Sequence, residues 1–132
     1  MIKIPKSIYE AIIKHAQKDA PIEACGYLGG ISGEAKVLYE MTNTDHSEEH
    51  FSFDPQEQFD AFKEASAKGW RLIACYHSHP ITPARPSQED IRLAYDPNIS
   101  YIIVSLADKE PVVKSFKIKG GEVTLEEIEV TI

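Results

Sequence analysis

The sequence has no basic cluster, no disulfide framework and no long apolar run, and each absence excludes a class of function. Its 14 lysines and arginines are scattered and its net charge is −7. Nucleic acids and anionic membranes attract basic patches, so neither is an expected partner. Two cysteines are too few to staple a secreted domain, and they predict a reduced, cytoplasmic protein. No apolar run is long enough to span a bilayer, and residues 1–5 show no signal-peptide pattern.

The length and the spacing of apolar residues predict one α/β domain. A chain of 132 residues can bury a core, and without repeats or linkers we expect a single domain over residues 1–132. Apolar periodicity and turn residues place helices and strands along it. Helices are expected at 7–20, 54–69 and 87–95, and strands at 22–30, 35–41, 70–76, 99–106, 112–118 and 123–132. The last two strands should form a terminal hairpin, and the order predicts helices packed on a mixed sheet.

Two of these helices carry specific start signals. Ser7 and Glu10 have capping-box spacing, and Asp54-Pro55 is a strong N-terminus for the second helix. In the second helix we expect Phe59, Phe62 and Ala65 to form the stripe that faces the sheet.

The stretch around His77 and His79 carries the strongest chemical signal. An apolar strand, 72–76, leads into these two histidines, and side chains that are two apart on a strand share a face. A loop stiffened by three prolines then returns a hydroxyl, Ser87, and a carboxylate, Asp90. Two imidazoles and one carboxylate are a known three-ligand set for a catalytic Zn²⁺, which keeps its fourth position for water.

Each part of this stretch also has an explanation without metal. Two histidines can simply decorate one face of a strand. Ser87 and Asp90 form a good capping box for the helix that they begin, and a helix N-terminus favours the Asp90 carboxylate. The capping and ligand interpretations are compatible, because the first turn of a helix orients its side chains well. The combination favours a metal site.

A rival metal motif lies in the polar loop 42–50. His46-Ser47-Glu48-Glu49-His50 matches the inverzincin pattern H-x-x-E-H, which needs a helix to project both histidines from one face. This stretch lacks helical periodicity, so we expect a solvated or substrate-facing loop.

Glu23 stands at the mouth of a mostly apolar strand. From this stretch alone, a solvated strand-end glutamate is the simpler interpretation. Nearby, Gly26, Gly29 and Gly30 suggest a bulge or a close approach of backbone. Cys25 and Cys75 are interpreted as small core residues.

Taken together, these motifs resemble those of a known family. His77-Ser78-His79-Pro80 followed by Ser87 and Asp90 resembles the JAMM (MPN+) metalloprotease signature H-x-H-x7-S-x-x-D, and segment 21–30 is similar to the family's segment with the catalytic glutamate. The resemblance covers nearly the whole chain, which is similar to a minimal prokaryotic member of the Mov34/MPN/PAD-1 group.

The resemblance implies a fold and a set of roles. The fold would be cytidine-deaminase-like, a three-layer α/β/α arrangement with a curved mixed sheet and three helices. His77, His79 and Asp90 would bind Zn²⁺, Ser87 would donate to the oxyanion, and Glu23 would hold and deprotonate the zinc water, which reverses the passive interpretation of Glu23. The substrate would be a peptide or isopeptide bond at the C-terminal tail of a ubiquitin-like or sulfur-carrier protein, with the tail added as a strand at a sheet edge.

Two other functions fit these residues less well than a zinc peptidase does. A non-catalytic module that binds ubiquitin-like tails would not need the ligand set, which this chain keeps complete. A nucleoside deaminase would need H-x-E together with P-C-x-x-C, and the two motifs do not occur together here.

Overall fold

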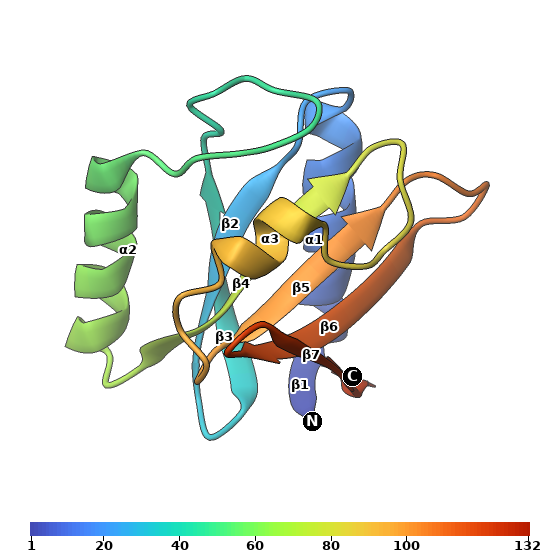
Figure 1. Ribbon diagram of the computed structural model, residues 1–132. Helices are drawn as coiled ribbons and strands as arrows, with labels where there is room; N and C mark the ends of the chain where they lie inside the picture. Colours follow the sequence, from blue (N-terminus) through green and yellow to red (C-terminus); the bar gives the residue numbers. More distant parts are fainter.

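The computed structural model describes all 132 residues and has one eight-stranded sheet with three helices. The elements follow in the order β1 (Ile2–Pro5), α1 (Lys6–Asp19), β2 (Cys25–Ile31), β3 (Glu34–Met41), α2 (Pro55–Ala67), β4 (Arg71–His79), α3 (Gln88–Arg92), β5 (Ser100–Ser105), β6 (Val112–Lys119), β7 (Glu122–Glu126) and β8 (Ile128–Thr131). The strand order across the sheet is β7-β6-β5-β4-β2-β3-β1-β8 (Figure 1). No helix combines the length and the apolar character that crossing a bilayer requires.

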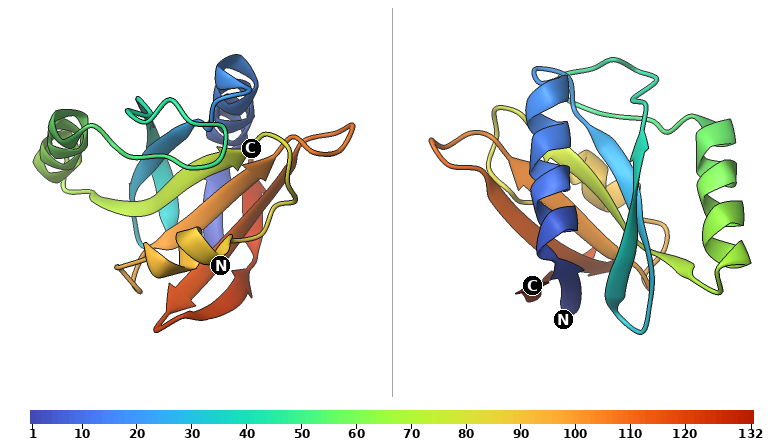
Figure 2. Two further views of the ribbon diagram at one scale, coloured as in Figure 1. Left: turned by 45° about the horizontal axis from the view of Figure 1, so that its top comes forward. Right: turned by 180° about the vertical axis from the view of Figure 1, so that it is seen from behind.

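The sheet is mixed and curved, and helices cover both of its faces. β4 pairs antiparallel with β2 and parallel with β5. Alternate residues of β4 and β5 point to opposite faces: Ala74 and Ile102 pack in the cluster under α1, whereas Cys75 and Ile103 belong to clusters on the other face. α1 lies on the first face, and α2 and α3 lie on the second (Figures 1 and 2). The expected three-layer α/β/α fold is therefore confirmed.

The chain ends depart from the predicted topology. β1 is a strand that the sequence did not predict, and it runs directly into α1. Lys6 therefore opens this helix, Pro5 caps it without a side-chain bond, and the expected Ser7–Glu10 capping box is wrong because Ser7 already lies inside the helix. The predicted terminal strand 123–132 is two strands. β7 pairs with β6 as expected, but β8 pairs in parallel with β1 at the opposite edge of the sheet.

α2 begins as predicted but presents a different face. The Asp54 side chain caps it by accepting hydrogen bonds from the amides of Gln56 and Glu57. The buried residues of the helix are Ala61 and Ala65, whereas Phe59 and Phe62 are each 55 % exposed, so the predicted stripe is wrong except for Ala65. Ala65 lies close to β2, since a Cβ built at Gly29 would be 3.7 Å from the Ala65 Cβ, an ordinary van der Waals contact.

The strand glycines admit close neighbours from within the sheet. A Cβ at Gly26 would clash with the Tyr76 ring, and one at Gly30 would clash with the Glu34 carbonyl oxygen. The predicted irregularity is present, since the β2 registers shift beside Gly29. The close approach at these glycines is made by the chain's own side chains and backbone.

Candidate metal centre

β4 carries both histidines on its α2- and α3-covered face. The apolar strand extends to His79, so the two imidazoles lie within the strand, and Ser78 between them points to the opposite face. His77 and His79 are each 5 % exposed, and their Nε2 atoms are 3.1 Å apart. Phe51 stacks on His77 with ring centroids 4.7 Å apart. The sheet thus presents two nitrogen donors from a rigid, buried position.

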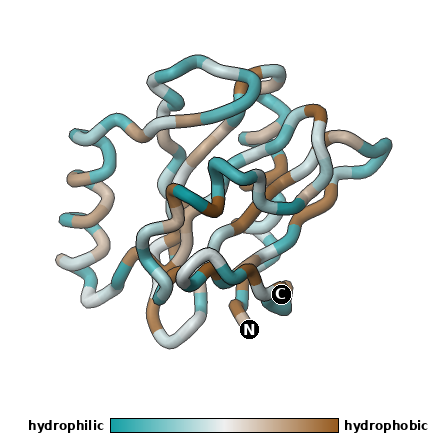
Figure 3. Tube along the Cα trace, in the orientation of Figure 1, coloured by the Kyte–Doolittle hydropathy of each residue, from teal (hydrophilic) through white to brown (hydrophobic).

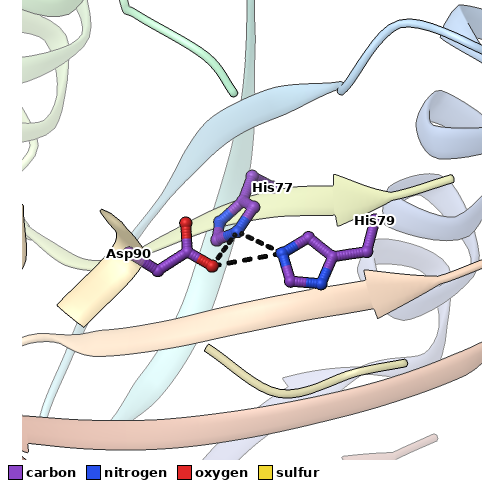
Figure 4. A group of neighbouring side chains, drawn as sticks. All are labelled: His77, His79 and Asp90. Carbon is purple, nitrogen blue, oxygen red and sulfur yellow. Dashed lines mark hydrogen bonds and ion pairs between the residues drawn. The ribbon is translucent and has the colours of Figure 1, made fainter. Parts of the chain in front are cut away.

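α3 brings the third group to the same point. Ser87 is the N-cap of this short helix, and its side chain accepts a hydrogen bond from the Asp90 amide at 3.0 Å. In return Asp90 Oδ2 accepts from the Ser87 amide at 2.9 Å, so the predicted capping box is confirmed. The same Oδ2 lies 3.1 Å from the Nε2 atoms of His77 and His79 (Figure 4). The capping and ligand geometries therefore coexist on one carboxylate.

This donor set fits a divalent cation. One ligand atom from each of His77, His79 and Asp90 lies within 4.8 Å of the others. His79 Nδ1 is 2.9 Å from the Pro83 carbonyl oxygen, which can only accept, so Nδ1 carries a proton. Once Nε2 is deprotonated, the neutral imidazole can direct its Nε2 lone pair at the centre. Convergent imidazole lone pairs and a carboxylate are the arrangement that a three-ligand zinc site requires.

Without a metal, the three groups hold one another electrostatically. Burial alone would raise the pKa of Asp90, but hydrogen bonds from His77 and His79 outweigh burial and hold that pKa far below its usual range. Burial lowers the pKa of His79, but its bonds to Asp90 and Pro83 prevail, and the pKa lies above the ordinary histidine value. A cation that binds here therefore replaces a proton.

Glu23 is buried beside this centre, so the solvated strand-end interpretation is wrong. It is 4 % exposed and directly precedes Ala24, which pairs with Ser78 just beyond the end of β2. Its Oε1 atom is buried and has no hydrogen-bond partner. Burial raises the pKa of Glu23 to about 8, and the positive charge of His79 partly offsets this rise. An orphaned carboxyl next to three convergent ligands fits a group that would bond to a water on the cation.

Glu23→Gln is expected to stabilise the metal-free protein at alkaline pH. Because the folded carboxyl has a pKa of about 8 against an ordinary value of 4.5, the folded state retains a proton that the unfolded chain releases, and stability falls as pH rises between these values. Glutamine has no charge to bury and escapes this loss. The melting temperatures of the chelator-treated variant and wild type should agree near the ordinary pKa and differ by at least about 4 °C above the raised one. Equal melting temperatures at both pH values would contradict the conclusion that burial of the charged Glu23 carboxylate is unfavourable.

The sequence is similar to a described family across most of its length. A model of prokaryotic homologs of the JAB domain matches residues 5–119. The chain belongs to this family. This membership confirms the JAMM/MPN resemblance, and relatives named as a peptidase and a desampylase place the chain among the JAMM-type peptidases and isopeptidases.

Relatives and solved structures agree with this assignment. The CysO-cysteine peptidase of Mycobacterium tuberculosis is 32 % identical over 98 % of this chain and 91 % of that protein. A desampylase of Pyrococcus furiosus is 30 % identical over 67 % of this chain and 62 % of that protein. The solution structure of a Desulfitobacterium hafniense protein is 47 % identical with a TM-score of 0.90, over 99 % of this chain and 93 % of that one. A JAB1/MPN domain protein of Archaeoglobus fulgidus shares the fold at 24 % identity, TM-score 0.69, over 98 % and 97 % of the two chains.

The rival motif of this JAB domain does not form a comparable site. Residues 42–50 form a mostly hydrophilic loop after β3, with no helix to align its histidines (Figure 3). His46 has a positive φ of 48°, and His50 Nδ1 lies 3.1 Å from Asp45 Oδ2. The inverzincin interpretation is therefore excluded, and the expected loop is confirmed.

The loop nevertheless contributes two residues that sequence reasoning missed. Phe51 stacks on His77, and buried Asn43 ties several turns of the loop together. The only sequence signal was the apolar alternation at 51–53, which marks a segment that packs on something.

An apolar cleft opens from the metal centre of the JAB domain between α2, α3 and the sheet. It has a volume of about 670 Å³, and His77 and Asp90 are among the residues that line it. Its apolar lining includes Tyr27, Phe53, Phe62, Leu72, Leu93 and Tyr101. Ser87 lies at the N-terminus of α3 and is exposed. Its oxygen accepts from the Asp90 amide, which leaves its hydroxyl proton free to be donated elsewhere.

Proposed function

We propose that this JAB domain is a zinc peptidase that hydrolyses a peptide or isopeptide bond at the C-terminal tail of a ubiquitin-like or sulfur-carrier protein in the cytoplasm. The observation that carries the proposal is the unpartnered Glu23 carboxyl, buried beside three converging ligands. The names of two relatives, a CysO-cysteine peptidase and a desampylase, support hydrolysis as the reaction. The two cysteines, both free and buried, suit a reducing compartment, and we treat residues 1–132 as one domain.

His77, His79 and Asp90 are the residues that would hold the zinc ion. Zn²⁺ in such a site lowers the pKa of a coordinated water toward about 7 and polarises a carbonyl. The buried setting of the two imidazoles excludes competing water from their side of the centre.

Glu23 and Ser87 would move and stabilise charge during the reaction. The carboxylate of Glu23 would accept a proton from the attacking water and deliver it to the leaving amine. In the metal-free protein burial raises the pKa of Glu23 to about 8. A cation at the centre would lower that pKa toward working pH, where a general acid–base residue works best. The exposed Ser87 hydroxyl would donate to the oxyanion that develops on the substrate carbonyl.

The substrate would approach along the cleft beside the metal centre. β4 is paired on both sides, by β2 and β5, and the free edges belong to β7 and β8 at the two ends of the sheet. An added strand at either edge would therefore lie away from His77. The apolar cleft is lined by His77 and Asp90 themselves, and its other side chains could contact an extended tail.

The test uses a sulfur-carrier protein ending in Gly-Gly and extended by one residue, and the same carrier joined to a lysine side chain. We expect zinc-loaded protein to release the carrier from at least one of these, and chelator-treated protein to release neither. Intact-mass spectrometry of the products gives the bond that is cut. Binding of both substrates without cleavage by zinc-saturated protein would contradict the proposal and favour a non-catalytic binding module.

A further inference from the structure

Glu23 is held in place although it lies outside the sheet. β2 begins at Cys25, and its last backbone pair toward this end is Cys25 with His77. Residues beyond a strand end usually move and are solvated. Glu23 and Ala24 are instead 4 % and 1 % exposed, so other contacts must fix them.

Ser78 provides the first of these contacts. Its amide donates to the Ala24 carbonyl oxygen at 2.9 Å, and its hydroxyl oxygen accepts from the Ala24 amide at 2.8 Å. The hydroxyl thereby satisfies an amide that has no strand partner. An alanine at position 78 would keep the first bond and leave the buried Ala24 amide unsatisfied, which natural structures avoid. The Ser78 side chain is fully buried on the α1 face of the sheet, opposite the metal ligands.

Asn43 provides the second contact. Its side-chain amide nitrogen donates to the Glu23 carbonyl oxygen at 3.1 Å and to the His50 carbonyl oxygen at 3.0 Å. Its side-chain oxygen accepts from the amides of Asp45 and Ser52. The loop that it organises also accepts from the Glu23 amide, through the Ser47 carbonyl oxygen at 2.9 Å. Asn43 is 4 % exposed and must donate and accept at once, which a carboxylate cannot do.

We propose that Ser78 and Asn43 are positioning residues that fix the main chain of Glu23 so that its carboxyl group faces the metal centre. All of their bonds to this segment go to main-chain atoms, whereas the Glu23 Oε1 atom has no partner. The Glu23 side chain is thus oriented through its main chain, while its Oε1 atom makes no hydrogen bond. The inference rests on the proposed function, because it explains how the proposed base is oriented.

Ser78→Ala is the first test. In the zinc-loaded enzyme kcat should fall about 10- to 100-fold, because a displaced base costs this much even when it remains present. KM and the zinc content should not change, since the histidines and the cleft stay in place. Ser78→Thr restores the hydroxyl and should restore most of kcat.

Ser115→Ala is the matched control. Ser115 is also fully buried, on β6, and its hydroxyl donates to Glu126, a contact that does not include Glu23 or Ala24. Its kcat should equal that of wild type even if its melting temperature falls. A fall in kcat equal to that of Ser78→Ala, or a fall in Ser78→Ala that parallels loss of zinc, would overturn the inference.

Amide hydrogen exchange of the metal-free protein is the second test. Exchange at Ala24 should accelerate in Ser78→Ala but not in Ser115→Ala. Exchange at Glu23 should accelerate in Asn43→Asp, which keeps the acceptor and loses the donor to the Glu23 carbonyl. If Glu23→Gln cleaves as fast as wild type, the proposed function fails. If that variant is inactive but Ser78→Ala keeps full kcat or unchanged exchange at Ala24, only the positioning role fails.

Discussion

Glu23→Gln is expected to lose about 10²- to 10⁴-fold in kcat while it keeps its zinc, the range over which a positioned proton-transfer group contributes to catalysis. The amide has nearly the shape of the carboxyl but cannot take a proton from water. None of the three proposed zinc ligands is changed, so metal analysis should give the wild-type ratio of zinc to chain. Steady-state cleavage of the carrier substrate measures the loss.

Glu49→Gln is the control for this effect. Glu49 lies exposed on the neighbouring loop, and its charge contributes only slightly to the raised pKa of Glu23. The substitution therefore removes one negative charge without removing a buried carboxyl. The variant should retain wild-type kcat. Wild-type cleavage by Glu23→Gln would remove this residue from the mechanism, and an equal loss in Glu49→Gln would show that net charge, and not proton transfer, is responsible.

Asp90→Asn should abolish zinc-dependent hydrolysis and most of the affinity for zinc. The carboxylate lies 3.1 Å from both imidazoles, and an amide is a poor substitute for a charged oxygen ligand. Since loss of an outer partner of a ligand already costs about 10- to 100-fold in affinity, loss of a ligand should cost more. Zinc titration followed by calorimetry gives the affinity. The shift of melting temperature on adding zinc should shrink in parallel, because it depends on the same binding.

His50→Ala separates the two histidine motifs in this experiment. His50 belongs to the H-x-x-E-H sequence, and in the structure it bonds to Asp45 on the exposed loop. Its removal should leave the zinc stoichiometry and kcat unchanged. A loss of zinc on removal of His50, with Asp90→Asn still loaded, would move the metal centre to the loop.

The convergence of His77, His79 and Asp90 was predictable because it is local. His77, His79 and Asp90 lie within fourteen residues, and strand alternation, proline stiffness and capping-box spacing each constrain where their side chains point. The burial of Glu23 could not be predicted from the residues next to it in the sequence. It depends on hydrogen bonds with Ser78 and Asn43, which are 55 and 20 residues away along the chain, and only the family resemblance pointed to this residue.

The errors in the fold have separate physical origins. Residues 128–131 alternate as a strand does, but alternation does not specify the partner, and β8 crosses to β1 at the far edge. β1 has only four residues, too few for a periodic signal. For α2 the prediction placed the larger apolar residues against the sheet. The helix instead lies close to β2 through small buried alanines, and Phe59 and Phe62 remain exposed.

Any attempt to redesign the proposed zinc site meets a constraint at Asp90. A single atom, its Oδ2, contacts both imidazoles and also the amide that begins α3. A substitution of Asp90 would therefore change both the start of α3 and the proposed coordination, and the two effects could not be separated. The bond between His79 Nδ1 and the Pro83 carbonyl oxygen offers a more independent handle, because a shift of that loop would rotate one ring and leave the helix start intact.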